Sequence, residues 1–91
     1  MKVYELLAEP ASWTQRSLAT NINGLPTDSN ADDACKWCLI GALKKCYLDD
    51  SEEYWDNFYR LQKKIPFISV WNDDRSRKHE EVVNLCRELD I

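Results

Sequence analysis

Four cysteines give this 91-residue chain its widest range of potential chemistry. Cys35 and Cys38 form a Cys-x-x-Cys pair, and Cys46 and Cys86 complete a set of four thiols. Four thiolates can hold structural zinc, but such sites usually combine two closely spaced pairs. All four cysteines here fall on the expected apolar faces of helices, where a free cysteine packs as a small hydrophobic residue. We therefore favour core packing and expect no metal and no cofactor, with zinc as the alternative.

Redox chemistry is a second use of the Cys-x-x-Cys pair. In a redox motif the first cysteine lies at a helix N-terminus, where the helix dipole lowers its pKa. Cys35 is expected within a turn or two of such an end, but Asp32 and Asp33 lie beside it and disfavour a thiolate. The sequence thus gives redox activity little support.

A cysteine hydrolase is a third interpretation. It needs a histidine base for the thiol and an Asn or Asp that orients the imidazole ring. His79 is the only histidine, and it can serve Cys38 with Asn72 or Asp73 only if the fold brings them together. The chain has no glycine-rich phosphate loop, nucleophile elbow or paired-carboxylate motif. We expect a protein that is not an enzyme and keep a thiol-dependent hydrolase as the second alternative.

Two tryptophans next to polar side chains indicate a binding site. The first tryptophan belongs to the segment Trp13-Thr14-Gln15 and the second to the segment Trp71-Asn72-Asp73. Each indole ring offers a flat apolar face and one N–H donor. Asn and Asp before a helix are also ordinary turn and cap residues, so these groups could instead anchor loops. If the two loops meet over the helix that contains the Cys-x-x-Cys pair, one shallow cleft forms. Its predicted lining is Trp13, Gln15, Cys38, Trp71, Asn72 and Asp73.

The hydrophobic pattern predicts the elements that position these residues. Pro10 ends a short first helix, and Asn23-Gly24 with Pro26 indicates turns, so an ordered loop or irregular hairpin follows. Apolar residues at helical spacing then predict three longer helices, of which the second begins after a Ser51 cap. A short apolar connection, expected to be extended, precedes the last helix. The expected ranges are helices over 3–8, 31–47, 52–65 and 77–89, the loop over 11–30 and the connection over 67–71. The prediction is a single domain over 1–91, mostly all-α, a compact four-helix mini-domain with a long irregular loop after the first helix.

The amino-acid composition limits the classes of partner that we expect this chain to bind. The chain has 12 basic and 16 acidic residues and a net charge of −4, the reverse of a typical nucleic-acid binder, so direct nucleic-acid binding is not expected. An acidic surface can still bind a basic partner. No signal peptide and no apolar run of about 18 residues is present, so we expect a cytoplasmic protein without membrane contact.

Several of these segments resemble one family in their order along the chain. The segments are Trp13-Thr14-Gln15, Gly24-Leu25-Pro26, the run from Trp37 to Leu43 (WCLIGAL), and Trp71-Asn72-Asp73 with Arg77 and Glu81-Val82-Val83. They resemble small bacterial and phage-borne proteins grouped as a domain of unknown function, with a tryptophan loop, a CLxGAL-like helix and a WND turn before the last helix. The resemblance spans residues 4–89 and implies a compact helical fold. Cys35 and Cys46 depart from its pattern, which weakens the zinc alternative.

Three functions follow from these observations. The first is a non-enzymatic domain that binds another protein, such as a phage- or mobile-element-encoded inhibitor of a host or antiviral-defence protein, because small size, acidity and abundant aromatics fit an interface better than a catalytic site. The second is binding of a flat aromatic or nucleotide-like ligand in the tryptophan-lined cleft. The third is the thiol-dependent hydrolase. A homodimer is compatible with the aromatic helical faces.

Overall fold

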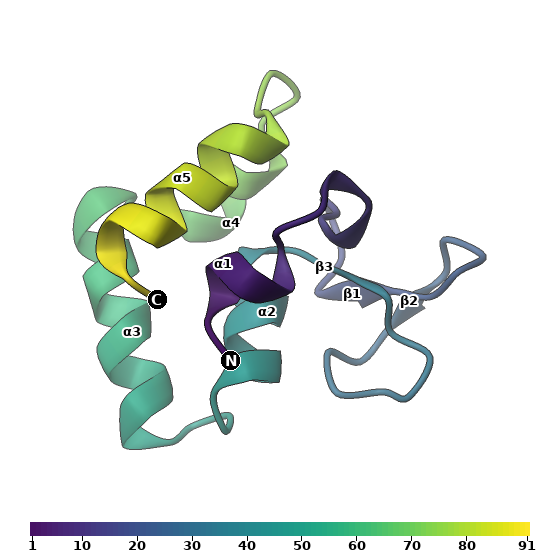
Figure 1. The fold of residues 1–91 in the computed structure, drawn as a ribbon, viewed down its shortest axis with the longest axis horizontal. Coiled ribbons are helices and arrows are strands. Elements are labelled where there is room, and N and C mark those ends of the chain that lie inside the picture. The colour runs from purple at the N-terminus through teal and green to yellow at the C-terminus, as the bar shows by residue number, and fades with distance from the viewer.

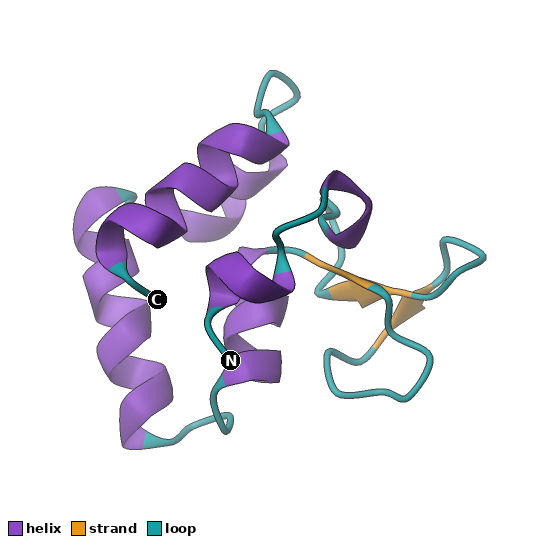
Figure 2. Ribbon diagram, viewed as in Figure 1, coloured by secondary structure: helices purple, strands orange, loops and turns teal.

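The computed structural model describes residues 1–91 and consists of five α-helices, one short 3-10 helix and a three-stranded antiparallel sheet. The helices form the larger part of the molecule, and the sheet projects at one side (Figures 1 and 2). The elements are α1 (Val3–Leu6), η1 (Pro10–Ser12), β1 (Ala19–Thr20), β2 (Pro26–Thr27), β3 (Lys36–Trp37), α2 (Leu39–Cys46), α3 (Glu52–Lys64), α4 (Ile68–Asp73) and α5 (His79–Leu89). A mostly helical fold is confirmed, but the structure has five α-helices and a small sheet where the sequence predicted four helices and a loop.

The segment between α1 and α2 contains a hairpin, one of the two outcomes that the sequence predicted, and a third strand that the sequence did not predict. β1 and β2 form an antiparallel hairpin, and β3 pairs with the other edge of β1, giving the order β2-β1-β3. The turn of the hairpin is closed by the Asn21 side chain, whose Oδ1 accepts bonds from the backbone of Asn23 and Leu25. Gly24 has a φ of +79°, a conformation that glycine adopts without steric cost. The Asn23-Gly24 turn prediction is therefore confirmed.

The predicted helix over 31–47 is wrong in its first half. α2 begins only at Leu39, because Lys36 and Trp37 pair with Thr20 and Ala19 as strand β3. The backbone N–H of Cys35 also donates to Thr20 O, at 2.9 Å. Helical spacing of apolar residues continued through this segment in the sequence, but sheet pairing satisfies its backbone groups.

Residues 67–71 were expected to be extended, and this prediction is also wrong. The N–H of Trp71 donates to Phe67 O at 2.9 Å, and Ile68–Asp73 forms α4. Ile68 and Asn72, four positions apart, are both buried and lie on one helical face. Burial of this face stabilises a helix in a segment whose β-branched and aromatic residues favour a strand.

α2 lies at the centre of the helical part and packs against α1, α3 and α4. Its buried Leu39, Ala42 and Leu43 join a core cluster that extends to α3, α5 and both termini. The two ends of the chain meet, since the N–H of Tyr4 donates to the carbonyl of Ile91 at 3.3 Å (Figure 1). None of the helices has the length and hydropathy that crossing a bilayer requires. The core thus fixes the start of α2, around which the candidate site is built.

Candidate functional site

Asn72 is the central residue of the candidate site. Only 1% of it is exposed, and its Oδ1 accepts hydrogen bonds from Trp13 Nε1 at 2.9 Å and from the Leu39 backbone N–H at 3.2 Å. Its Nδ2 donates to Thr14 O at 3.3 Å and to Asp73 Oδ1 at 2.9 Å. One amide side chain therefore joins the early loop, the first turn of α2 and the end of α4.

Gln15 and Arg16 extend this junction. Gln15 Nε2 donates to the carbonyl oxygens of Asn72 and Asp74, at 2.9 and 2.8 Å. The backbone N–H of Arg16 donates to Asp73 Oδ1 at 2.9 Å, and Arg16 has a φ of +69°, a left-handed conformation that costs energy for a residue with a Cβ. These bonds to α4 offset that cost. The Nε2 of Gln15 and both polar atoms of the Asn72 amide are thus bonded within the protein itself.

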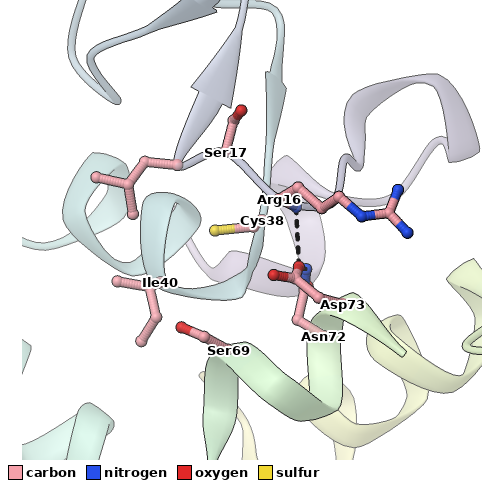
Figure 3. A pocket seen from close by; sticks show the side chains of 8 residues that line it. Arg16, Ser17, Cys38, Ile40, Ser69, Asn72 and Asp73 are labelled. Atoms are coloured by element: carbon pink, nitrogen blue, oxygen red, sulfur yellow. Dashed lines mark hydrogen bonds between the residues drawn. The ribbon is translucent and has the colours of Figure 1, made fainter. Parts of the chain in front are cut away.

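A small pocket lies beside this junction, and we call it the Cys38 pocket (Figure 3). Its volume is about 190 Å³. In Figure 3 the Cys38 sulfur and the Ser69 hydroxyl point into the space between the start of α2 and α4, whereas the Arg16 side chain points away. The lining residues are Arg16, Ser17, Leu18, Cys38, Ile40, Ser69, Asn72 and Asp73. This volume is below the roughly 300–1,000 Å³ of typical ligand pockets, so the pocket suits a small molecule about the size of benzene better than a nucleotide.

The thiol of Cys38 is not activated. Burial raises the pKa of the Cys38 thiol, and the negative charge of Asp73 adds to that rise, although backbone N–H groups of Gly41 and Ile40 oppose it. The sulfur instead caps α2, accepting the Gly41 N–H at 3.4 Å. A protonated thiol is a weak nucleophile, so Cys38 acts here as a helix cap.

His79 does not join Cys38. Its Nε2 donates to the carbonyl oxygen of Leu7, and its ring lies 6.4 Å from the Trp13 ring, centroid to centroid. His79 is absent from the lining of the Cys38 pocket. The set that a cysteine hydrolase requires is therefore not assembled in this structure.

Trp71 faces a different part of the surface from Trp13. The guanidinium of Arg77 lies 3.8 Å from the centroid of the Trp71 ring, and Arg77 Nε donates to Trp71 O at 3.0 Å. Trp71 lines a second hollow, which we call the α4 groove, whereas Trp13 lines no pocket. The α4 groove has a volume of about 400 Å³, and its lining is Lys64, Ile65, Pro66, Phe67, Val70, Trp71, Asp74 and Arg77. The structure thus joins Trp13, Gln15, Asn72 and Asp73, but Trp13 and Trp71 do not share a cleft.

The cysteines are dispersed through the fold. No group of three or more His, Cys, Asp and Glu side chains is arranged to hold a metal ion. All four cysteines are free thiols, and burial raises the pKa of Cys46 to about 11 and that of Cys86 to about 12. These two thiols pack as apolar groups.

Sequence reasoning missed the most exposed part of the α4 groove. Phe67 is 76% exposed and Val70 71% exposed, and both belong to the apolar run that was expected to be an extended connection. Their helical spacing from the buried Ile68 and Asn72 was the signal that could have placed them on the outer side of a helix.

Comparison with known proteins gives one match. The model of a family of unknown function, DUF6197, matches residues 2–89. Since the match covers nearly the whole chain, this protein belongs to that family, and the resemblance to a small domain of unknown function is confirmed. No curated protein and no solved structure matches the chain.

Proposed function

We propose that this chain is a non-enzymatic protein-binding domain and that the α4 groove is its contact surface. One observation carries the proposal: Phe67 and Val70 expose about three quarters of their surface beside Trp71 and Arg77. Large apolar side chains grouped in a hollow are typical of interaction sites, and Trp and Arg are the residues that most often dominate binding energy. Such a domain acts as an inhibitor or as an adaptor, depending on which surface of the partner it covers.

The charges around the groove define the partner segment. The lining contains the cations Lys64 and Arg77 and the single carboxylate of Asp74, so its formal charge is +1 in a chain with a net charge of −4. Hydrogen bonds from Ser76 lower the pKa of Asp74, which keeps it ionised. Both cations already form surface ion pairs, Lys64 with Glu88 and Arg77 with Glu81, and such pairs are weak enough to be exchanged for a partner's carboxylates. A partner segment with one or two large apolar side chains flanked by carboxylates therefore complements this lining.

Selection of peptides against the purified chain tests this proposal. A displayed random-peptide library is expected to yield sequences in which an aromatic or large aliphatic residue adjoins Asp or Glu. The Phe67→Ser/Val70→Ser double variant should lose at least tenfold in affinity for them. Ile22→Ser is the matched control, because Ile22 is an apolar residue that is 90% exposed and belongs to the hairpin turn, distant in sequence from the α4 groove. Peptides that bind the double variant and the parent equally well would refute the groove as the contact surface.

A second candidate, small-ligand binding, has support from the Cys38 pocket rather than from a tryptophan-lined cleft. Ser17, Ser69 and Asp73 surround about 190 Å³ with hydroxyl and carboxylate groups. The stacked Arg77 covers one face of the Trp71 ring, so a flat aromatic ligand has less access there. A thermal-shift screen with small polyols and amines tests this candidate. An upward shift that Ser69→Ala abolishes supports it, and no shift across the panel removes it.

A further inference from the structure

The solvent side of α3 has an ordered arrangement of charges and aromatic rings. We call Glu52, Trp55, Asp56, Tyr59 and Lys63 the outer face of α3, since all five are exposed and lie opposite the buried side of the helix. Glu52 stands at the start of this face and Lys63 at its end, and Asp56 lies between the two aromatic residues, Trp55 and Tyr59, in its middle. The outer face of α3 is separate from the α4 groove, since the two share no residue.

The aromatic pair is stacked and open to solvent. The rings of Trp55 and Tyr59 lie 5.7 Å apart with an interplanar angle of 28°, and Tyr59 is 54% exposed. The edge of Phe58 supports both rings, at centroid distances of 5.2 and 5.8 Å. Trp55 Nε1 is also held by Asp50 Oδ1. The pair is therefore preorganised, and rigid aromatic rings of this kind lose little conformational entropy when they are covered by a partner.

The charges of the outer face have no partners within the chain. Glu52, Asp56 and Lys63 take part in none of its four salt bridges. Glu52 and Asp56 stand four positions apart and repel each other. Eleven residues separate Glu52 from Lys63, about 16 Å along a helix, so the two cannot pair within α3. The helix dipole alone favours acids first and cations last, but it does not require an exposed aromatic pair between them.

We propose that the outer face of α3 binds the same face of a second copy of the chain, with the two helices antiparallel about a twofold axis. In a twofold interface the same patch serves both subunits. Glu52 then lies opposite Lys63 of the partner subunit, the aromatic pairs meet at the axis, and Asp56 lies opposite Tyr59 of the partner subunit. A parallel arrangement would place like charges opposite each other. A purely basic foreign surface would repel Lys63, whereas a second copy complements both ends of the face.

The size of the face sets the strength of this dimer. A 13-residue helix is about 20 Å long, so two such helices bury less than the roughly 800 Å² per partner of a standard interface. We therefore expect a weak dimer that forms with rising concentration and dissociates as salt screens its ion pairs.

Sedimentation equilibrium of the full chain tests the dimer. The parent protein should change from monomer to dimer between low micromolar and near-millimolar concentration, and Trp55→Ala/Tyr59→Ala should weaken association at least tenfold while circular dichroism shows that it remains folded. Phe67→Ser/Val70→Ser should dimerise like the parent, which separates this inference from the groove. A parent chain that stays monomeric throughout, or a dimer that the aromatic variant does not weaken, would overturn the proposal.

A mixing experiment tests the antiparallel geometry. Glu52→Lys alone and Lys63→Glu alone each place like charges opposite each other, so each should dimerise at least fivefold more weakly than the parent. Mixed in equal amounts, with one variant labelled with ¹⁵N, they should form a heterodimer visible by native mass spectrometry. Both ion pairs are then present, one with its original polarity and the other with its polarity reversed. If the mixture gives no excess of heterodimer over the random proportion, the antiparallel pairing is wrong.

Discussion

The indole N–H of Trp13 donates a hydrogen bond of 2.9 Å to Asn72 Oδ1, a contact between residues 59 positions apart in the sequence. The same oxygen accepts the Leu39 backbone N–H, which is one of the donors that a helix start leaves without a partner inside the helix. The side chain of Asn72 thus holds the early loop and the N-terminus of α2 together. Because this junction is buried, its hydrogen bonds contribute to the stability of the whole fold.

Replacing Asn72 should destabilise the protein strongly. Asn72→Ala removes four hydrogen bonds and leaves Trp13 Nε1 and the Leu39 N–H without their acceptor, so we expect the free energy of unfolding to fall by about 3 kcal/mol. Urea denaturation followed by far-UV circular dichroism measures the change. Asn30→Ala is the control, since Asn30 is exposed and its side chain makes one long contact of 3.5 Å. A loss below about 1 kcal/mol would show that the junction matters little.

The coupling between the two residues can be measured directly. Trp13→Phe removes the indole donor together with part of a ring that packs against the core, and it should cost at least about 1 kcal/mol, although Asn72 Oδ1 keeps the bond from Leu39. The Trp13→Phe/Asn72→Ala double variant should lose less free energy of unfolding than the sum of the two single losses, by at least about 0.5 kcal/mol. Such a difference is expected for residues in one hydrogen-bond network. Simple additivity would mean that the bond contributes nothing to stability.

The sequence predicted this site in part. Trp13, Gln15, Asn72 and Asp73 were expected to come together if the two tryptophan loops meet over α2, and the structure joins these four residues by hydrogen bonds. The absence of Trp71 from this junction was not predictable, since it depends on the direction of the Trp71 side chain relative to that of Asn72. Adjacent residues of a helix point about 100° apart, so α4 directs Asn72 into the core and Trp71 toward Arg77.

Helices α3 and α5 were predictable, whereas the start of α2 and the strand β3 were not. Ser51 before two glutamates, and Pro66 after the last apolar residue, mark α3 by local signals, and α3 spans Glu52–Lys64. The strands have two residues each, too few to show alternation. The hairpin of β1 and β2 was one of the two outcomes that the Asn23-Gly24 turn led us to expect, whereas the pairing of β3 with β1 joins residues further apart in the chain and had no signal in the sequence.

Gly41 should tolerate no side chain. A Cβ at this position would lie 1.8 Å from the carbonyl oxygen of Leu18, so backbone would have to move. Although alanine favours helices by about 1 kcal/mol over glycine, we expect Gly41→Ala to cost about 3 kcal/mol in net stability. Thermal unfolding of Gly41→Ala and of Gly24→Ala gives the comparison, since Gly24 has open space around it and should lose only about 1 kcal/mol from its positive φ. Equal effects at the two glycines would contradict the close approach.

The cap of α3 is open to a simple test. Ser51 Oγ accepts the N–H of Tyr54 at 3.1 Å, so Ser51→Ala should lower the free energy of unfolding by about 1 kcal/mol. Ser51→Asp keeps an acceptor at the same position and should retain most of the stability. The two variants are compared by urea denaturation. If alanine and aspartate are equivalent, the cap does not stabilise the helix.

The cysteines should react with alkylating reagents in an order set by burial. Cys35 is partly exposed and should react first with iodoacetamide at pH 8, whereas burial and a raised pKa slow Cys38, Cys46 and Cys86. Peptide mass mapping after timed quenching gives the four rates, and labelling in urea provides the reference. A Cys38 that reacts faster than Cys35 in the folded protein would revive the thiol-hydrolase hypothesis.

Stability should fall at alkaline pH because of the buried thiols. The pKa of Cys86 rises from its ordinary value of 9.0 to about 12, so above pH 9 the unfolded chain releases a proton that the folded chain retains. The free energy of unfolding is therefore unaffected by this thiol below pH 9 and decreases by about 1.4 kcal/mol per pH unit from there toward pH 12. Cys46, with a pKa of about 11, acts in the same direction over a narrower range.

Urea denaturation at intervals from pH 8 to pH 10.5 measures this slope, and Cys86→Ala provides the comparison. The variant should be less stable at pH 8, because a fully buried side chain is shortened, yet its stability should decline less steeply with pH. Burial also raises the pKa of Tyr47 and Tyr54, but both remain in the variant, so the difference between the two slopes isolates Cys86. Parallel slopes for parent and variant would mean that the Cys86 thiol ionises in the folded protein as readily as in the unfolded chain.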